Sequence, residues 1–341
     1  MVNDGSVDAE EATQLLAKAT GRNFELVGRL TGGETGAHEV RGPGNERLVL
    51  KWELDPSSRA SRRVAVGLTE RLQREAHWPV PQQEFFDVGD RLLITQELLP
   101  GRPVQELTHD LLDQLFALHQ ARLGLARPED DSTWPDHLIE TLALGGASYC
   151  LHEPLRKHDR RTAELIDRIE RVATTLDPES VVGHDIVHWD WHQGNLLEVD
   201  GDLTAVIDND FVTTGDAAFD LVTLAVAGLN MACEDGVRDR IDAVAFDGLS
   251  QQRRQAYEAH LLLRLIDWSI RTNDSTMSTS GCPRRNSASQ REYFDRWRSS
   301  RSTILCQARA GVLNCGSSAT GGGQWGPASR ASSVRCSTRT P

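Results

Sequence analysis

The chain has 341 residues, which is enough for two domains with hydrophobic cores, and its net charge is −13. This acidity argues against nucleic acids and anionic membrane surfaces as ligands. It suits a cationic ligand, although a surface that is acidic only for solubility accounts for the charge equally well.

The N-terminal residues and the cysteines bear on the cellular compartment. Residues 1–11 are acidic and include no apolar segment, so no signal peptide is expected. The apolar run Leu221–Leu229 is too short to span a bilayer. Cys150 and Cys233, the two cysteines before the C-terminal tail, have no metal-ligand spacing. This pattern is typical of a cytoplasmic protein without disulfides.

The first 98 residues predict a small antiparallel sheet. Apolar residues at helical spacing predict a short helix over 10–19, and a second helix is expected from about 58 to 77. Apolar stretches separated by turn residues predict five strands. The strands are expected at 24–30, 38–41, 48–52, 85–88 and 92–95. We therefore expect a five-stranded antiparallel sheet with one helix packed on it.

After a linker at 98–103 the pattern becomes mainly helical. The expected helices lie around 111–118, 165–172, 218–227 and 251–270, and a hairpin is expected between 195 and 207. The predicted fold class is α+β, with a small lobe at residues 1–98 and a larger, mostly helical lobe at 99–273. Residues 274–341 are rich in Ser, Arg and Gly and are predicted to be disordered.

One stretch carries most of the chemical information. It reads H-x-D-x-x-x-x-N from His188 to Asn195, and Asp208 follows at the end of an apolar strand. Phosphoryl transfer from ATP needs this set of residues. Asp190 would orient the attacking hydroxyl and accept its proton, His188 would hold the loop, and Asn195 and Asp208 offer the oxygen ligands that Mg²⁺ prefers. A lone Asp is more often a turn or cap residue, but four residues at this spacing favour catalysis.

The same stretch allows a second interpretation, because His184, His188 and His192 are spaced by four. On a helix they would share one face and could bind Zn²⁺. The flanking β-branched residues and the helix-breaking Gly183 and Gly194 argue against a helix here. We therefore expect His184 and His192 to make ordinary polar contacts.

A glycine-rich turn and a lysine predict where phosphates bind. Gly32, Gly33 and Gly36 lie between two predicted strands, where backbone N–H groups can surround a phosphate. Such a turn is weak support by itself, because hairpins also need Gly. Lys51 strengthens it, since the chain has only three lysines and this one stands in an apolar strand. Its side chain would face away from the neighbouring apolar residues and contact the α- and β-phosphates.

Two further assignments complete the nucleotide site. An acid on the helix at 58–77 is expected to pair with Lys51, and of Glu70 and Glu75 we favour Glu70, although each is more often a solvated helix residue. Gln96 and Leu98, just before the linker, would present backbone groups to the adenine.

Two carboxylates follow Asp208. Asp216 is placed to cap the helix that begins near residue 218, and Asp220 lies one turn further along the same face. We expect both to have structural roles as cap and buried hydrogen-bond acceptor.

With these motifs in place, the chain resembles the aminoglycoside phosphotransferase family, which is related to the protein kinases. The resemblance covers about Phe24–Ile270, and its most specific parts are the loop at 188–195, Ile207-Asp208 and the stretch 215–221. It implies a bilobal protein-kinase-like fold with ATP and Mg²⁺ between the lobes and a small, hydroxylated, often cationic acceptor. It also assigns Asp190 as the catalytic Asp and Asn195 and Asp208 as the metal ligands.

Two features depart from the family pattern. Trp189 stands where the family usually has Gly after the loop histidine, so it would narrow the acceptor site or shift the loop. The helix acid falls nearer the Val80-Pro81 pair than expected, which leaves the assignment of Glu70 open.

Three functions are compatible with the sequence. The first is an ATP-dependent O-phosphotransferase acting on a small molecule such as an aminoglycoside-like or other cationic antibiotic. The second is a kinase of a metabolite such as an amino alcohol, a sugar or homoserine. The third is a nucleotide-binding regulator without catalysis, against which Asp190 argues because a pure binder has no use for it. The acceptor and the oligomeric state do not follow from the sequence.

Overall fold

The computed structural model describes residues 8–30, 37–53, 58–89, 91–130, 134–146, 149–228 and 231–275, which all belong to one structural unit. The predicted phosphate turn with Gly32, Gly33 and Gly36 lies outside the described residues, as does the predicted tail from residue 276 onward.

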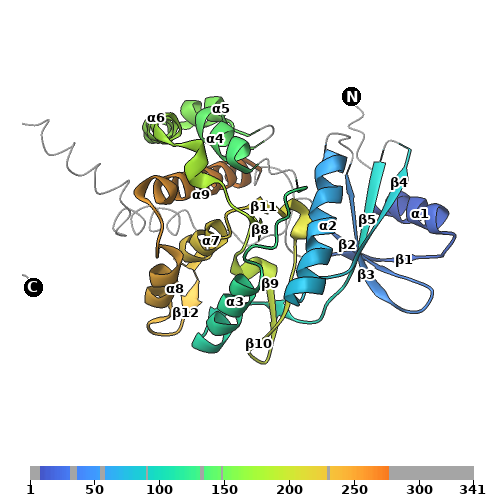
Figure 1. The fold of residues 1–341 in the computed structure, drawn as a ribbon. Helices are drawn as coiled ribbons and strands as arrows, with labels where there is room; N and C mark the ends of the chain where they lie inside the picture. The colour runs from blue at the N-terminus through green and yellow to red at the C-terminus, as the bar shows by residue number, and fades with distance from the viewer. Residues whose placement is uncertain are drawn as a thin grey trace, which may run out of the picture. The chain divides into compact units, whose positions relative to one another are not determined.

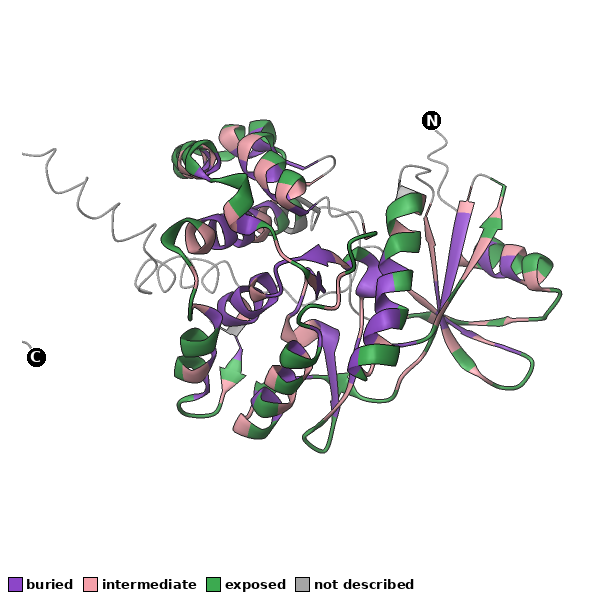
Figure 2. Cartoon of the chain, viewed as in Figure 1, coloured by how far each residue is buried: buried purple, intermediate pink, exposed green. Residues whose placement is uncertain are grey.

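Alternating apolar residues near the N-terminus form a five-stranded antiparallel sheet in the order β1-β2-β3-β5-β4 (Figure 1). Its strands are β1 (Glu25–Arg29), β2 (His38–Arg41), β3 (Arg47–Glu53), β4 (Gln83–Val88) and β5 (Arg91–Glu97). Strand β5 pairs on both sides and is buried along most of its length (Figure 2), which explains its continuous apolar sequence.

Two helices accompany this sheet. Helix α1 (Ala9–Thr20) begins at Asp8, whose side chain accepts the Glu11 N–H, and ends at Gly21 in the left-handed conformation. Its Leu16 packs in one cluster with Leu50 and other apolar residues of the sheet. Residues on alternate positions of β3 face opposite sides, so Lys51 points away from this cluster, as the sequence predicted.

Helix α2 (Ser58–Ala76) joins the sheet to the rest of the molecule. Its buried residues Ala65, Leu68 and Leu72 belong to the same hydrophobic cluster as Leu112 of helix α3 (His109–Ala121) and Trp191. Helix α2 also packs against the short 3₁₀ turn η3 (Asn209–Phe211). The helix is therefore fixed against the C-terminal lobe.

The larger lobe is mainly helical (Figure 1). Its further helices are α4 (Trp134–Leu144), α5 (His152–His158), α6 (Arg160–Thr175), α7 (Ala218–Gly228), α8 (Val237–Ala245) and α9 (Gln251–Ser275). Three small sheets complete it. Strand β6 (Arg102–Pro103) pairs with the hairpin of β9 (Leu196–Val199) and β10 (Asp202–Val206); β8 (Asp185–Val187) pairs with β11 (Thr213–Gly215); and β7 (Glu106–Leu107) pairs with β12 (Ala232–Cys233).

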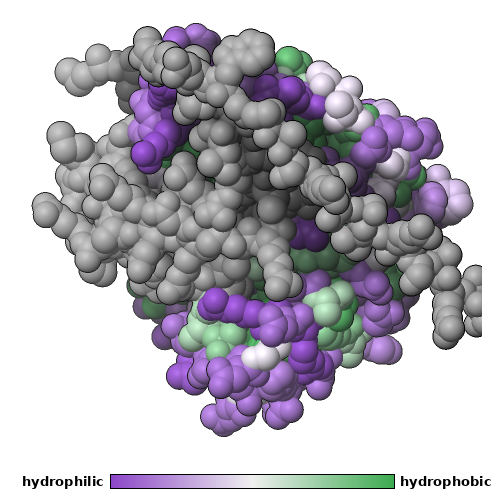
Figure 3. Space-filling model, turned by 90° about the vertical axis from the view of Figure 1, so that its left-hand side faces the viewer, coloured by the Kyte–Doolittle hydropathy of each residue, from purple (hydrophilic) through white to green (hydrophobic). Residues whose placement is uncertain are grey.

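The strands of the N-terminal sheet, the hairpin of β9 and β10, and the longer helices agree with the sequence-based prediction to within a few residues. Helices α4, α5 and α8 and the short strands β6, β7, β8, β11 and β12 were not assigned in advance. Helix α9 runs through Ser275, so residues 274 and 275 continue a helix instead of beginning the tail. No helix within the described ranges combines the length and the apolar character needed to cross a membrane. On the face shown in Figure 3, the described residues are mostly hydrophilic, with apolar patches among them.

Candidate active site

The loop between β8 and β9 is held in place by His188, which is fully buried. Its Nδ1 accepts the backbone N–H of Asp190 at 3.3 Å, so Nε2 carries the ring proton and donates to the carbonyl oxygen of Ile207 at 3.0 Å. Burial lowers the pKa of His188, which keeps the ring neutral. His188 thus ties the loop of Asp190 to the segment that precedes Asp208, which is the structural role predicted for it.

The carboxylate of Asp190 is surrounded by donors. Oδ1 lies 2.8 Å from the Arg264 guanidinium, and Oδ2 accepts from Asn195 Nδ2 at 3.2 Å and lies 3.3 Å from His192 Nε2. Burial alone would raise the pKa of Asp190, but Arg264 and then His192 outweigh it and hold that pKa well below its usual range. Asp190 is therefore ionised, as an acceptor of a hydroxyl proton must be.

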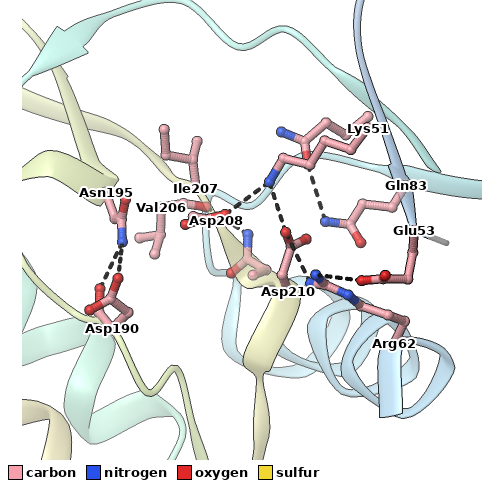
Figure 4. A network of polar contacts seen from close by, with 12 residues as sticks. Lys51, Glu53, Arg62, Gln83, Asp190, Asn195, Val206, Ile207, Asp208 and Asp210 are labelled. Carbon is pink, nitrogen blue, oxygen red and sulfur yellow. Dashed lines mark hydrogen bonds and ion pairs between the residues drawn. The ribbon is translucent and has the colours of Figure 1, made fainter. Parts of the chain in front are cut away.

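Asn195 is oriented by the same loop. Its side-chain nitrogen donates to the backbone oxygen of Asp190 at 2.9 Å as well as to the carboxylate, so the amide oxygen points away from Asp190 (Figure 4). The backbone oxygen of Asn195 accepts the N–H of Ile207 at 2.9 Å. Asn195 and Asp208 are thereby brought to neighbouring positions, each with an oxygen that a hard cation could use.

Asp208 follows β10 in the left-handed conformation, with φ of 61°. Its Oδ1 lies 2.8 Å from Lys51 Nζ, although 157 positions separate the two residues in sequence (Figure 4). This contact joins the N-terminal sheet to the C-terminal lobe. In the part of the chain that the structure describes, no group of three or more His, Cys, Asp or Glu side chains could hold a metal ion by itself.

The second carboxylate that pairs with Lys51 is Asp210 and not the predicted Glu70. Asp210 Oδ2 lies 3.0 Å from Lys51 Nζ and 3.0 Å from Arg62 of helix α2. Burial by itself would lower the pKa of Lys51, but Asp210 and Asp208 together raise it, so the ammonium is retained. Glu70, the predicted partner, is exposed on α2, and the ion pairs of Lys51 are made with carboxylates of the other lobe instead.

The residues predicted to contact adenine lie at the end of β5. Gln96 is buried, and its side-chain oxygen is 3.4 Å from Gln83 Nε2. The backbone N–H of Leu98 donates to the carbonyl oxygen of Arg47 at 3.1 Å. That N–H is thus paired within the N-terminal lobe, and contact of Gln96 and Leu98 backbone groups with an adenine stays a prediction.

The two carboxylates after Asp208 have the structural roles expected of them. Asp216 Oδ1 accepts the N–H of Ala218 at 3.1 Å and caps α7. Asp220 is fully buried, forms an ion pair with the equally buried Arg122, and accepts the backbone N–H of His188 at 2.7 Å. Asp220 therefore fixes the start of the loop that carries Asp190.

Trp189 occupies the unusual position noted in the sequence. Its φ is 78°, a region that favours glycine, and its ring is almost completely buried. The ring centroid lies 4.9 Å from that of Trp134, 5.1 Å from that of His260 and 5.3 Å from that of Phe219. This aromatic cluster fixes the side chain among helices α4, α7 and α9.

The histidine spacing does not form a helical metal site. Strand β8 separates His184 from His188, and a 3₁₀ turn follows His192. His192 Nδ1 accepts the N–H of Gly194 at 3.0 Å, which is an ordinary cap contact. The residues that the sequence analysis missed are Arg62, Asp210 and Arg264, because each acts through a partner that is distant in sequence.

Comparisons with known proteins agree with this geometry. A family model described as the phosphotransferase enzyme family (APH) matches residues 40–263, a stretch that includes Lys51, Asp190, Asn195 and Asp208. No curated protein matches the chain.

The chain is also similar to solved structures. The crystal structure of aminoglycoside phosphotransferase APH(4)-Ia has a TM-score of 0.56 and 18% identity, over 79% of this chain and 95% of that chain. The amicoumacin kinase hAmiN, in complex with AMP-PNP, Ca²⁺ and Ami, has a TM-score of 0.57 and 15% identity, over 88% and 94% of the respective chains. A thermostable mutant of APH(4)-Ia, in a ternary complex with ADP and hygromycin B, has a TM-score of 0.53 and 17% identity, over 78% and 94%. At these identities the similarity is one of fold, and it confirms the predicted bilobal kinase-like architecture.

Proposed function

Since the chain belongs to the phosphotransferase enzyme family, it is a small-molecule kinase, and we propose that it transfers the γ-phosphate of ATP to a hydroxyl group of its acceptor with the help of Mg²⁺. The single observation that carries this proposal is the contact of 2.8 Å between Lys51 Nζ and Asp208 Oδ1. It brings a cation from the sheet and a carboxylate from the other lobe to one place, where phosphates and a metal ion need them.

Each residue of the site has a role in this reaction. Asp190, held ionised by Arg264, accepts the hydrogen bond of the acceptor hydroxyl and takes its proton as the new P–O bond forms and the bond from the γ-phosphorus to the leaving ADP breaks. Asn195 and Asp208 would hold Mg²⁺ through their oxygens, and the ion would supply positive charge that offsets the charge of the transferred phosphoryl group. Lys51 contacts the α- and β-phosphates, and His188 positions the loop.

The nucleotide and the compartment follow from similar reasoning. Structures with this fold were solved with ADP or AMP-PNP, which supports ATP as the phosphate donor. Because ATP is made and used in the cytoplasm, and Cys150 and Cys233 are both free thiols, we place the reaction there.

For the acceptor, we favour a small polyhydroxylated molecule. The acidic balance of the chain and the molecules bound in the similar structures, hygromycin B and Ami, favour an aminoglycoside-like or other cationic antibiotic. A metabolite kinase is the second candidate. One observation supports it: the charged group nearest Asp190 is the Arg264 guanidinium, which repels an ammonium placed beside the reacting hydroxyl.

A panel of acceptors tests the proposal. ATP consumption is measured with aminoglycosides, other cationic antibiotics, amino alcohols, sugars and homoserine. With the active acceptor, Asp190→Ala is expected to lower turnover about 10²–10⁴-fold, because it removes the group that orients and deprotonates the hydroxyl. Asp247→Ala, at an exposed position, is the control and should leave turnover unchanged. Full turnover in Asp190→Ala would refute the proposed mechanism.

A further inference from the structure

A row of four charged side chains extends from the proposed phosphate-binding lysine. Lys51 pairs with Asp210, Asp210 pairs with Arg62, and Arg62 Nη2 lies 3.7 Å from Glu53 Oε2 (Figure 4). Lys51 and Glu53 are two residues apart on β3, so they project from the same face of the strand. The signs of the charges alternate along the row, and its members come from β3, α2 and η3.

The row is well ordered by packing. The side chains of Lys51 and Arg62 are each 12% exposed and that of Asp210 is 6% exposed. The Arg62 guanidinium also lies 4.9 Å from the ring centroid of Phe211, the residue after Asp210. Asn209, the residue before Asp210, donates to the carbonyl oxygen of Val206 at 3.0 Å and fixes the turn. Asp210 is therefore a rigid carboxylate and not a mobile surface acid.

The contacts of Lys51 with Asp208 and with Asp210 should respond differently when a metal ion binds. Asp208 is the more exposed of the two, with 38% of its side chain accessible, and it is the proposed metal ligand. Once its oxygens coordinate a cation, they attract Lys51 less strongly, and the cation itself repels the ammonium. When Asp208 coordinates a cation, Asp210 still pairs with Lys51, because Arg62 and the turn fix the position of the Asp210 carboxylate.

We propose, on the basis of the function proposed above, that Asp210 is the positioning residue for Lys51 and that Arg62 orients Asp210 from helix α2. The acid that holds the phosphate-binding lysine thus comes from the segment after Asp208, while the helix contributes a cation. This assignment explains why Glu70 is exposed and takes no part in the site.

Binding of two probes tests this proposal without a known acceptor. Isothermal calorimetry measures the Kd of AMP-PNP with Mg²⁺ and the Kd of adenosine, which has no phosphate for Lys51 to contact. In Asp210→Asn, the Kd of AMP-PNP should rise about tenfold or more, as is usual when one partner of a buried charge pair is removed, while that of adenosine stays within about twofold of wild type. The variant should fold, since Lys51 retains Asp208 and Arg62 retains Glu53.

The direction of the change in AMP-PNP affinity separates a positioning role of Asp210 from a purely electrostatic one. Removing a negative charge near a polyanion would tighten AMP-PNP binding if Asp210 acted through its charge alone. The positioning role predicts weaker binding instead. In a Lys51→Ala background, Asp210→Asn should no longer weaken AMP-PNP binding, because there is no ammonium left to position. Arg62→Gln is the second variant and should show the same selective loss for AMP-PNP.

A matched control is the ion pair that Arg63, on the same helix, forms with Asp87 of β4. Both side chains are about half exposed, so Asp87→Asn removes a carboxylate from an ion pair of α2 outside the row. It should leave both dissociation constants unchanged.

The outcomes are distinguishable. If wild-type protein does not bind AMP-PNP, the proposed function is refuted. If it does, and Asp210→Asn binds AMP-PNP equally or more tightly, the positioning role is refuted. An equal loss for adenosine and AMP-PNP would also refute it, because Asp210 would then only support the fold.

Discussion

Asp220 accepts the backbone N–H of Trp189 at 2.9 Å, so a buried carboxylate on α7 fixes the residue that precedes the proposed catalytic Asp190. The same carboxylate accepts the N–H of His188 and pairs with Arg122. One side chain thus links the catalytic loop to a buried cation. Both the stability of the protein and the geometry of the site should therefore depend on Asp220.

The first prediction concerns this buried pair. Asp220→Ala should lower the free energy of unfolding by about 3–5 kcal/mol, because it leaves the Arg122 guanidinium buried without its carboxylate. Urea unfolding measures the change. Glu153→Ala, which removes one partner of an exposed pair with Lys157, is the control and should have little effect. A similar, small loss in both variants would contradict the role of Asp220.

The second prediction concerns the backbone of Trp189. Trp189→Ala should destabilise the protein by about 3–5 kcal/mol, because it removes a buried aromatic ring. Trp189→Gly loses the same ring but relieves the positive φ, so it should be more stable than Trp189→Ala by about 1 kcal/mol. At an ordinary helical or strand position the glycine variant would be less stable than the alanine variant. Thermal unfolding of the two variants side by side decides this, and a less stable glycine variant would show that the strain is absent.

The third prediction concerns Arg264, which donates to the carbonyl oxygen of Trp189 at 3.0 Å and to Asp190 at 2.8 Å. Arg264→Gln should lower kcat about 10²-fold, since a small displacement of a catalytic group is costly, and leave AMP-PNP affinity nearly unchanged. Steady-state kinetics with the acceptor found in the panel, together with calorimetry, separate the two effects. Arg271→Gln, on the same helix, is the control. An unchanged kcat in Arg264→Gln would contradict a positioning role for this arginine.

The fourth prediction is a pH dependence of stability. Burial and then the nearby Arg122 lower the pKa of His119 from 6.5 to about 3. Arg122 donates to His119 Nδ1 at 3.1 Å, which a protonated ring could not accept. Between pH 6.5 and about pH 3, His119 of the unfolded chain binds a proton that His119 of the folded protein does not bind. The stabilising effect is thus complete above pH 6.5 and is lost progressively as the pH falls toward 3.

His119→Gln, which keeps an acceptor for Arg122, isolates this contribution. Between about pH 7.5 and about pH 5, wild-type protein should lose about 2 kcal/mol more unfolding free energy than the variant. Urea titrations at the two pH values give the difference. Parallel curves for both proteins would mean that His119 titrates normally in the folded state.

The sequence alone was sufficient for features that are encoded locally. The spacing of His188, Asp190, Asn195 and Asp208 is a property of one short segment, and the periodicity of the strands and long helices is equally local. The opposite orientation of Lys51 and Leu50 also follows from strand geometry.

Features that depend on distant partners could not be predicted. Asp210 is one of several acids near Asp208, and Arg62 is one of several arginines on its helix. Only the docking of α2 against η3 shows that these two residues meet each other and Lys51. Glu70 was favoured because a helix acid is the usual partner of such a lysine. In this fold the lysine pairs instead with Asp208 and Asp210, which come from another segment.

The connection between the sheet and the helical lobe has one more consequence. Strand β5 ends at Glu97, and β6 is already paired with β9 at Arg102. Pro100 accepts a hydrogen bond from Thr204, and a Cβ on Gly101 would lie 2.6 Å from the same hydroxyl oxygen. The connection is thus held at both ends, by the Leu98 N–H on the carbonyl oxygen of Arg47 and by Pro100 on Thr204. A tether this short would limit how wide the entrance for a nucleotide can become.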